Sequence, residues 1–230
     1  MKLNIIKIII IGALLFASSH LSFSQGFMNL NFESTTLTNN GPPNTGVSTT
    51  VALPGWTAYI GGTSQSTILY NNTTAGSSSI AVWGSYSGPG YSFNALQGKF
   101  SAVLTAGPSN ASISQTGLIP VDTVSILFNA AQFYTPTNFL VSMNGQAINI
   151  ALITSTANYT VFGGDISAYA GQMANLTFTC LTAYSSGIPL LSLELDNIRF
   201  STAIVPEPGA LALAALGAVL FGSRLWKKVL

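Results

Sequence analysis

The chain has 230 residues, and only seven Lys or Arg and six Asp or Glu are charged, which is 6% where about 25% is usual. Seven scattered cations cannot make the positive field that nucleic-acid binding needs, and a coiled coil needs far more Glu and Lys. Because 48% of the residues are hydrophobic, disorder driven by charge is excluded too. With 27 Ser and 23 Thr, the composition instead indicates a hydroxyl-rich β protein.

Residues 1–24 predict a secretory signal peptide. Two lysines precede an apolar stretch at residues 8–17, and small serines at positions 22 and 24 predict a cut before Gln25. The alternative is a permanent membrane anchor, but this needs about 20 apolar residues, twice the length found here. We therefore expect export through the inner membrane and removal of this segment.

Residues 25–204 form the predicted domain, which is large enough to bury roughly 70% of its unfolded surface. Two basic and five acidic residues give it a net charge of −3. Short alternating apolar runs predict an all-β sandwich or barrel. These runs lie at residues 28–33, 79–83, 91–96, 100–104, 123–128, 139–143, 159–162, 176–181 and 189–200.

Local signals refine this pattern. Asn144-Gly145 predicts a tight hairpin turn, and Asp165 with Gly171 predicts one capped helical turn between two strands. In the last strand the apolar side chains change from odd to even positions, so we expect a bulge near Asp196-Asn197 that turns Glu194 and Asp196 outward. The single cysteine, Cys180, alternates with apolar residues and is expected to be buried.

Four segments carry a family resemblance. NLNFES, LPGW, YTVFGGDISAYAGQMANLTF and LELDNIRF occur in this order and resemble the galactose-binding-like jelly rolls of bacterial carbohydrate-binding modules. The resemblance implies two antiparallel sheets whose first and last strands lie close together. It also implies a structural Ca²⁺ with Glu33 and Asp196 among its ligands, oxygen donors of the type that calcium prefers. The alternative is that both acids simply face solvent.

The C-terminal residues 205–230 differ in composition from the domain. Val205-Pro206-Glu207-Pro208 precedes an apolar stretch at residues 209–221, which has no polar face for water. A basic end follows, comprising Arg224, Lys227 and Lys228. This tail resembles the PEP-CTERM sorting signal, although its basic cluster is interrupted.

The resemblance implies cutting by an exosortase-type membrane protease and transient anchoring by a C-terminal hydrophobic helix. The protein would then reach the cell surface or the extracellular space. The complete prediction is an antiparallel jelly-roll β-sandwich flanked by an N-terminal signal helix and this C-terminal helix.

Catalytic patterns are scarce. The only histidine, His20, lies in the signal peptide, so the domain has no His-based triad or dyad. Glu194 and Asp196 could form a glycosidase pair, but they sit two residues apart on one strand rather than across a cleft. We therefore predict that the protein is not an enzyme, with a surface glycoside hydrolase as the alternative.

Aromatic side chains among Gly, Ser and Asn give the one hint of a ligand. Tyr86, Tyr91 and Trp83 are candidates for stacking on sugar rings, although Trp83 also suits the core. We expect a non-enzymatic surface or matrix protein that binds exopolysaccharide. The other alternative is a structural scaffold without a ligand.

Overall fold

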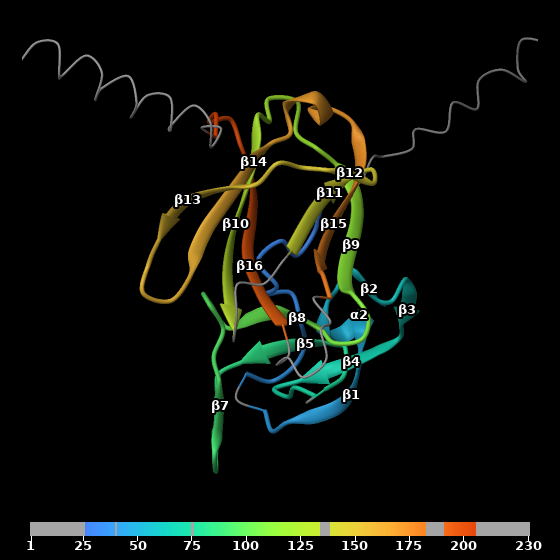
Figure 1. Ribbon diagram of the computed structural model, residues 1–230, viewed down its shortest axis with the longest axis vertical. Helices are drawn as coiled ribbons and strands as arrows, with labels where there is room; N and C mark the ends of the chain where they lie inside the picture. The colour runs from blue at the N-terminus through green and yellow to red at the C-terminus, as the bar shows by residue number, and fades with distance from the viewer. Residues whose placement is uncertain (1–25, 40, 75, 134–138, 183–190, 206–230) are drawn as a thin grey trace, which may run out of the picture.

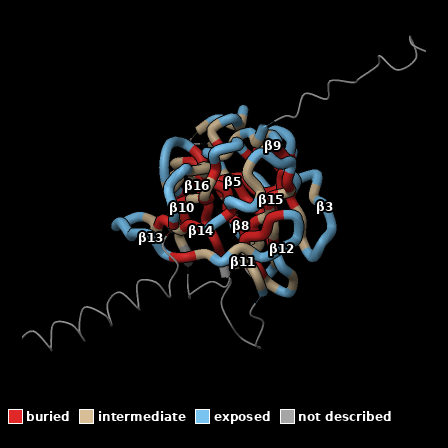
Figure 2. The backbone as a smooth tube through the Cα atoms, turned by 90° about the horizontal axis from the view of Figure 1, so that it is seen from above, coloured by how far each residue is buried: buried red, intermediate tan, exposed pale blue. Residues whose placement is uncertain are grey.

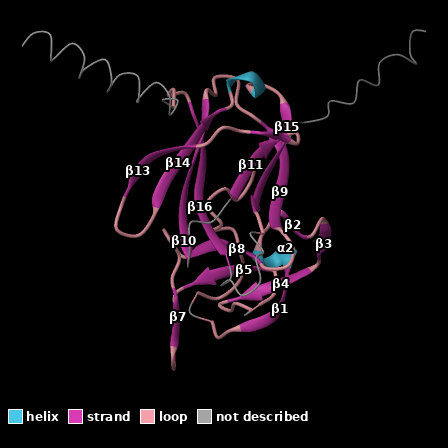
Figure 3. Cartoon of the chain, in the orientation of Figure 1, coloured by secondary structure: helices cyan, strands magenta, loops and turns pink. Residues whose placement is uncertain are grey.

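The computed structural model describes residues 26–39, 41–74, 76–133, 139–182 and 191–205. Two β-sheets pack face to face, which confirms the predicted all-β sandwich (Figures 1 and 3). The two terminal helices of the prediction lie outside the described residues.

The larger sheet has eight strands and the smaller one has six. In spatial order the larger sheet contains β1 (Asn44–Ser48), β4 (Thr67–Tyr70), β5 (Ser79–Gly84), β8 (Phe100–Ala106), β16 (Leu191–Ser201), β10 (Ser125–Phe133), β14 (Thr160–Asp165) and β13 (Ala151–Ser155). The smaller contains β12 (Gln146–Ala147), β11 (Phe139–Met143), β15 (Met173–Cys180), β9 (Ala111–Leu118), β2 (Thr57–Ile60) and β3 (Thr63–Gln65).

Three further elements complete the fold. A separate hairpin of β6 (Tyr86–Gly88) and β7 (Tyr91–Phe93) projects from one end of the sandwich (Figure 1). The short helix α2 is formed by Thr49–Ala52, and the single 3₁₀ turn η1 by Ser167–Tyr169. The end of β16 lies beside η1 at the end opposite the hairpin (Figure 1).

One strand pair departs from the predicted antiparallel arrangement. β4 and β5 run parallel, with Leu69 opposite Ala81. Asn71 explains how the chain leaves β4, because its φ of 43° turns the backbone out of the sheet. Its side-chain oxygen accepts a bond from the N–H of Gly84 at 2.8 Å and fixes this exit beside β5.

The core lies between the sheets, and Figure 2 shows the buried segments in the interior of the domain. Aromatic rings join the layers: Phe178 of β15 lies 5.0 Å from Phe128 of β10 and 6.4 Å from Trp56, measured between ring centroids. Cys180 is fully buried, as expected, and burial raises the pKa of its thiol to about 11. Hydrophobic packing therefore supports this domain, because a single cysteine cannot form an intramolecular disulfide.

The predicted strand at residues 28–33 is wrong. Asn29 and Phe32 have φ values of 51° and 56°, which belong to a turn and not to a strand. The N–H of Phe32 donates to the carbonyl of Asn29, and the side chain of Asn29 accepts from Ser34. The turn buries Phe32 completely, so the apolar side chain that suggested a strand still enters the core.

The other local predictions are confirmed. Asn144 and Gly145 have φ values of 51° and 78° between the paired residues Met143 and Gln146. Asp165 accepts a bond from the N–H of Ser167 at the start of η1. The pairing of β10 with β16 shifts between Leu127 and Asn129, which places the extra residue of the predicted bulge in β16 after Asp196.

Candidate functional site

Asp196 lies on β16 immediately before the bulge, and its carboxylate is held by the loop that leads into β8. The N–H of Gln97 donates to Oδ2 at 2.9 Å, and the N–H of Asn197 donates to Oδ1 at 2.6 Å. The hydroxyl of Ser101 approaches Oδ2 at 3.4 Å. Asp196 is only 1% exposed, so the predicted outward orientation toward solvent is wrong.

Glu33 reaches the same loop from the N-terminal turn. Its Oε1 accepts bonds from the N–H groups of Lys99 at 2.7 Å and Phe100 at 3.1 Å. Gly98 has a φ of +65°, and a Cβ there would collide with the Glu33 carboxylate. Glycine at position 98 therefore favours this path of the loop, because the positive φ is strained for other residues and a Cβ would displace the Glu33 carboxylate.

Together these residues line a pocket of about 250 Å³, with Asn31, Gln97 and Asn197 adding side-chain amides. The pKa of Asp196 is raised to about 7, mainly by burial and in smaller part by the negative charge of Glu33, against the lowering effect of its hydrogen bonds. The structure thus brings together the two acids that the sequence resemblance names. A nearby cation would relieve the cost of keeping both ionised.

A cation here would need more than carboxylates. Across the described residues, no group of three or more His, Cys, Asp or Glu is placed to hold a metal. The amide oxygens of Asn31 and Asn197, which share the pocket, are donors of the hard type that Ca²⁺ accepts. The donor set therefore fits a calcium ion and does not fit a metal that requires imidazole or thiolate.

Glu194, two residues earlier on β16, is a buried acid that the sequence analysis placed at the surface. It is 1% exposed, and its Oε1 has no hydrogen-bond partner among the described residues. The pKa of Glu194 is raised to about 8, mainly by burial. A hydrogen bond with Ser101 lowers this pKa, and the negative charge of Asp196 raises it. Glu194 is therefore largely protonated at neutral pH.

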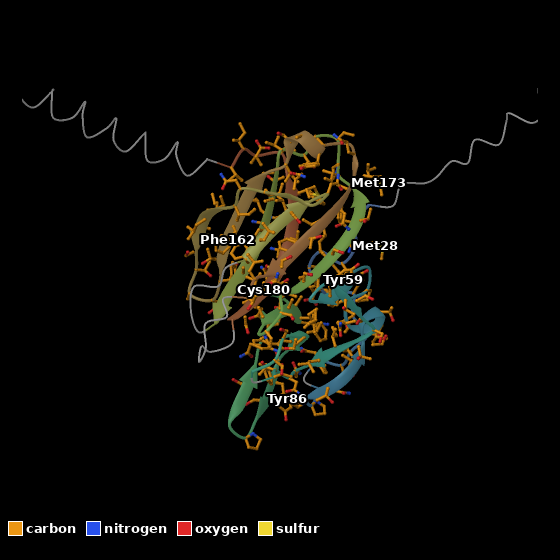
Figure 4. All side chains as sticks on the ribbon, turned by 45° about the vertical axis from the view of Figure 1, so that its right-hand side comes forward. Met28, Tyr59, Tyr86, Phe162, Met173 and Cys180 are labelled. Carbon is orange, nitrogen blue, oxygen red and sulfur yellow. The ribbon has the colours of Figure 1, made fainter. Side chains whose placement is uncertain are left out.

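The predicted sugar-binding aromatics lie at the β6–β7 hairpin and beside it. The ring of Tyr86 packs over Gly88, where a Cβ would approach it to 2.8 Å, and Tyr86 lies at the hairpin end in Figure 4. Ser85, Ser87, Ser92 and Asn94 complete an open pocket of about 490 Å³ around it.

The other two aromatics contribute differently. Trp83 is half-buried, and its Nε1 donates to the carbonyl of Asn72. Its ring is tilted by 53° against that of Phe93, with 5.0 Å between the centroids, so Trp83 belongs mainly to a small apolar cluster. The backbone of Tyr91 lies in β7, but its side chain is outside the described residues.

The sorting residues lie almost wholly beyond the described chain. Only Val205, which is buried against the sandwich, falls within it, whereas Pro206, Glu207, Pro208, Arg224, Lys227 and Lys228 do not. In the described ranges, no helix is both long enough and apolar enough to span a bilayer. The predicted C-terminal membrane helix lies outside those ranges.

Comparison with known proteins identifies the tail. Residues 205–228 match the PEP-CTERM protein-sorting motif. The chain therefore carries the signal of an exported protein that an exosortase-type system processes, and its destination is the cell surface or the extracellular space, with an anchoring tail at the C-terminus.

Two solved structures resemble the domain distantly. No curated protein matches the sequence. A cyclase from Fischerella sp. TAU, solved in complex with 4-(1H-indol-3-yl)butan-2-one, is 17% identical with a TM-score of 0.45, covering 77% of this chain and 96% of that one. The enzymatically active domain of tailspike protein 4 from bacteriophage CBA120 is 16% identical with a TM-score of 0.37, covering 75% and 21%. Similarity at this level is too weak to assign the function of either protein to this chain.

Proposed function

We propose that this protein is a non-enzymatic component of the cell surface or extracellular matrix, built on a calcium-stabilised jelly-roll sandwich that binds exopolysaccharide. The observation that carries the proposal is the arrangement of the chain. A PEP-CTERM tail begins at one end of the sandwich, and a polar pocket with an aromatic ring lies at the other. A protein anchored through this tail would hold its β6–β7 hairpin on the side of the domain away from the membrane.

The hydrophilic hairpin pocket suits a neutral sugar polymer. Tyr86 offers a ring for the apolar face of a pyranose, and the three serines and Asn94 offer hydroxyl and amide groups for its edges. None of the described residues that line the pocket is charged. A neutral or weakly charged polysaccharide is thus the ligand class that the pocket fits.

We expect Tyr86→Ala to weaken binding on an array of bacterial polysaccharides by roughly 2- to 10-fold, because an aromatic stacking contact contributes about 0.5–1.5 kcal/mol. Tyr159→Ala, which removes a partly exposed ring from the β13–β14 hairpin, is the matched control and should bind normally. Equal binding by both variants would leave a scaffold without a sugar ligand as the better description.

We expect EDTA to lower the melting temperature of the domain if Glu33 and Asp196 hold calcium. When free Ca²⁺ is present at 100 times its Kd, binding adds about 2.7 kcal/mol to the free energy of unfolding. For a domain of this size, that corresponds to a rise in the melting temperature of roughly 5–10 °C. Excess Ca²⁺ should restore the value. Asp196→Asn should abolish the EDTA effect, whereas Asp122→Asn, at an exposed acid, should retain it. A shift below about one degree would contradict the metal proposal.

A glycoside hydrolase is the second candidate, and Glu194 is the observation in its favour. A general acid must carry a proton at working pH, and the raised pKa of Glu194 satisfies this. However, Glu194 and Asp196 are both buried on one strand, which does not place them on opposite sides of a glycosidic bond. Release of reducing sugar that is lost in Glu194→Gln would favour the hydrolase.

A further inference from the structure

Three exposed apolar side chains lie in segments at the end of the sandwich opposite the hairpin, which is also the end where the tail begins. Val121 is 82% exposed, Ile204 is 81% exposed and Met173 is 48% exposed. Figure 4 shows Met173 far from Tyr86, which marks the hairpin end. Exposure of single apolar side chains is common, so what these three contact has to be argued from the chain that follows them.

Backbone contacts tie the segments that carry these side chains to the sandwich. Val121 occupies a turn that the N–H of Thr123 closes on the carbonyl of Pro120. A Cβ on Gly171, two residues before Met173, would lie 3.3 Å from Val121. Just before Ile204, the carbonyl of Ala203 accepts a bond from the Ser125 hydroxyl at 2.7 Å. The apolar groups are therefore fixed at this end and are not carried by a free terminus.

The length of the tail determines what this end meets. The apolar segment starts at Gly209, four residues after the last described one, Val205. Four residues span at most about 14 Å, and two of the intervening three are prolines, which restrict the chain. The headgroup layer on each side of a bilayer is roughly 5–8 Å thick. Once the apolar segment is in the membrane, the chain exit at Val205 must lie close to the lipid headgroups, and the end of the sandwich that carries it is brought near them.

We propose that Val121, Met173 and Ile204 form a lipid-facing surface that rests on the bilayer while the tail is attached. The inference depends on the anchored tail of the proposed function. It adds an orientation of the domain on the bilayer. The end of β16, η1 and the β9–β10 turn face the membrane, and the β6–β7 hairpin points away from it (Figure 1).

The contact is apolar and not electrostatic. Asp122 lies beside Val121, and Asp165 lies at the end of β14 that pairs with Ser125 near the chain exit. These acids repel anionic headgroups, so the surface favours zwitterionic lipid. We expect the contact to weaken in vesicles rich in anionic lipid at low ionic strength and to recover when salt is added.

The test places an environment-sensitive fluorophore on single cysteines in the full exported chain, inserted into phosphatidylcholine vesicles. The sites are V121C and I204C at the proposed surface and A214C in the tail. V51C is the matched control, a partly exposed valine on α2, away from this end (Figure 1). The native Cys180 is buried and reports the labelling background. Melting of each labelled variant checks that the domain is folded.

We expect a blue shift and quenching by headgroup spin labels at V121C and I204C but not at V51C. If A214C is in lipid while V121C and I204C behave like V51C, the surface is overturned and the anchored tail stands. If A214C is also in water, the anchoring fails and this inference fails with it. Since the vesicles contain no other protein, contact with a processing protease cannot produce the expected signal.

Discussion

Replacing Glu194 by glutamine is expected to stabilise the domain at alkaline pH and to flatten much of the dependence of its stability on pH. The glutamine has almost the shape of the glutamic acid and remains neutral. The wild-type side chain, fully buried with Oε1 unpartnered among the described residues, must either keep its proton or ionise in an apolar site.

The direction follows from proton binding in the two states. Burial raises the pKa of Glu194 from 4.5 to about 8 in the folded protein, so the native state holds one more proton than the unfolded state between these values. The free energy of unfolding then falls by about 1.4 kcal/mol for each pH unit in this range. The stabilisation that comes from the proton on Glu194 is fully present below about pH 4.5 and is lost as pH rises through 8. The free energy of unfolding falls by roughly 3–6 kcal/mol over this range.

Urea unfolding from pH 5 to 9 in EDTA measures this effect. EDTA keeps metal from ionising Asp196, whose own raised pKa adds a slope of the same sign up to about pH 7. Asp122→Asn, at an exposed acid, is the control and should follow the wild type. If the wild-type protein is equally stable at pH 5 and pH 8.5, Glu194 is not protonated in the folded state.

The burial of Glu194 could not be predicted from the sequence. The alternation of Leu193 and Leu195 against Glu194 and Asp196 correctly separates the core face of β16 from its other face. Alternation does not tell whether that other face meets water. β16 lies in the middle of an eight-stranded sheet, between β8 and β10, and the loop before β8 lies over Asp196. Burial of the acids depends on these partners, which are distant in sequence.

Features set by a few neighbouring residues were predictable. The Asn144-Gly145 turn and the cap at Asp165 depend on local backbone preferences, and the bulge in β16 follows from a change in side-chain parity. The turn at residues 28–33 was not predictable from alternation, because apolar spacing carries no information about a positive φ at Asn29. That turn depends on β9, whose Gln115 side chain donates to the Met28 carbonyl at 3.0 Å.

The candidate cation pocket is an intermediate case. Glu33 and Asp196 were paired through a family resemblance, and the structure places both against one loop. The reason for their approach lies in the backbone of residues 97–100, whose N–H groups bind both carboxylates. No spacing rule connects residues 33 and 196, and the preference for glycine at position 98 becomes visible only in three dimensions.

Changing the sorting motif is expected to have the largest effect on the protein's location. In a host that contains an exosortase, we expect the double substitution Pro206→Ala and Pro208→Ala to block cutting, so that the full tail is retained and the chain accumulates in the membrane fraction. Proline favours an extended backbone and interrupts helices, so we expect its replacement to remove the extended segment that the protease would bind.

Intact mass measurement of membrane and extracellular fractions tests this expectation. The wild-type chain should lose its C-terminal segment near Pro208, and the double variant should not. Pro120→Ala, which changes an exposed proline at the same end of the sandwich, controls for effects on folding and should be processed normally. Because the substitutions lie beyond the last described residue of the domain, melting should be unchanged. A double variant that is still trimmed and released would show that the protease recognises the apolar segment and the basic end without the Pro-Glu-Pro sequence.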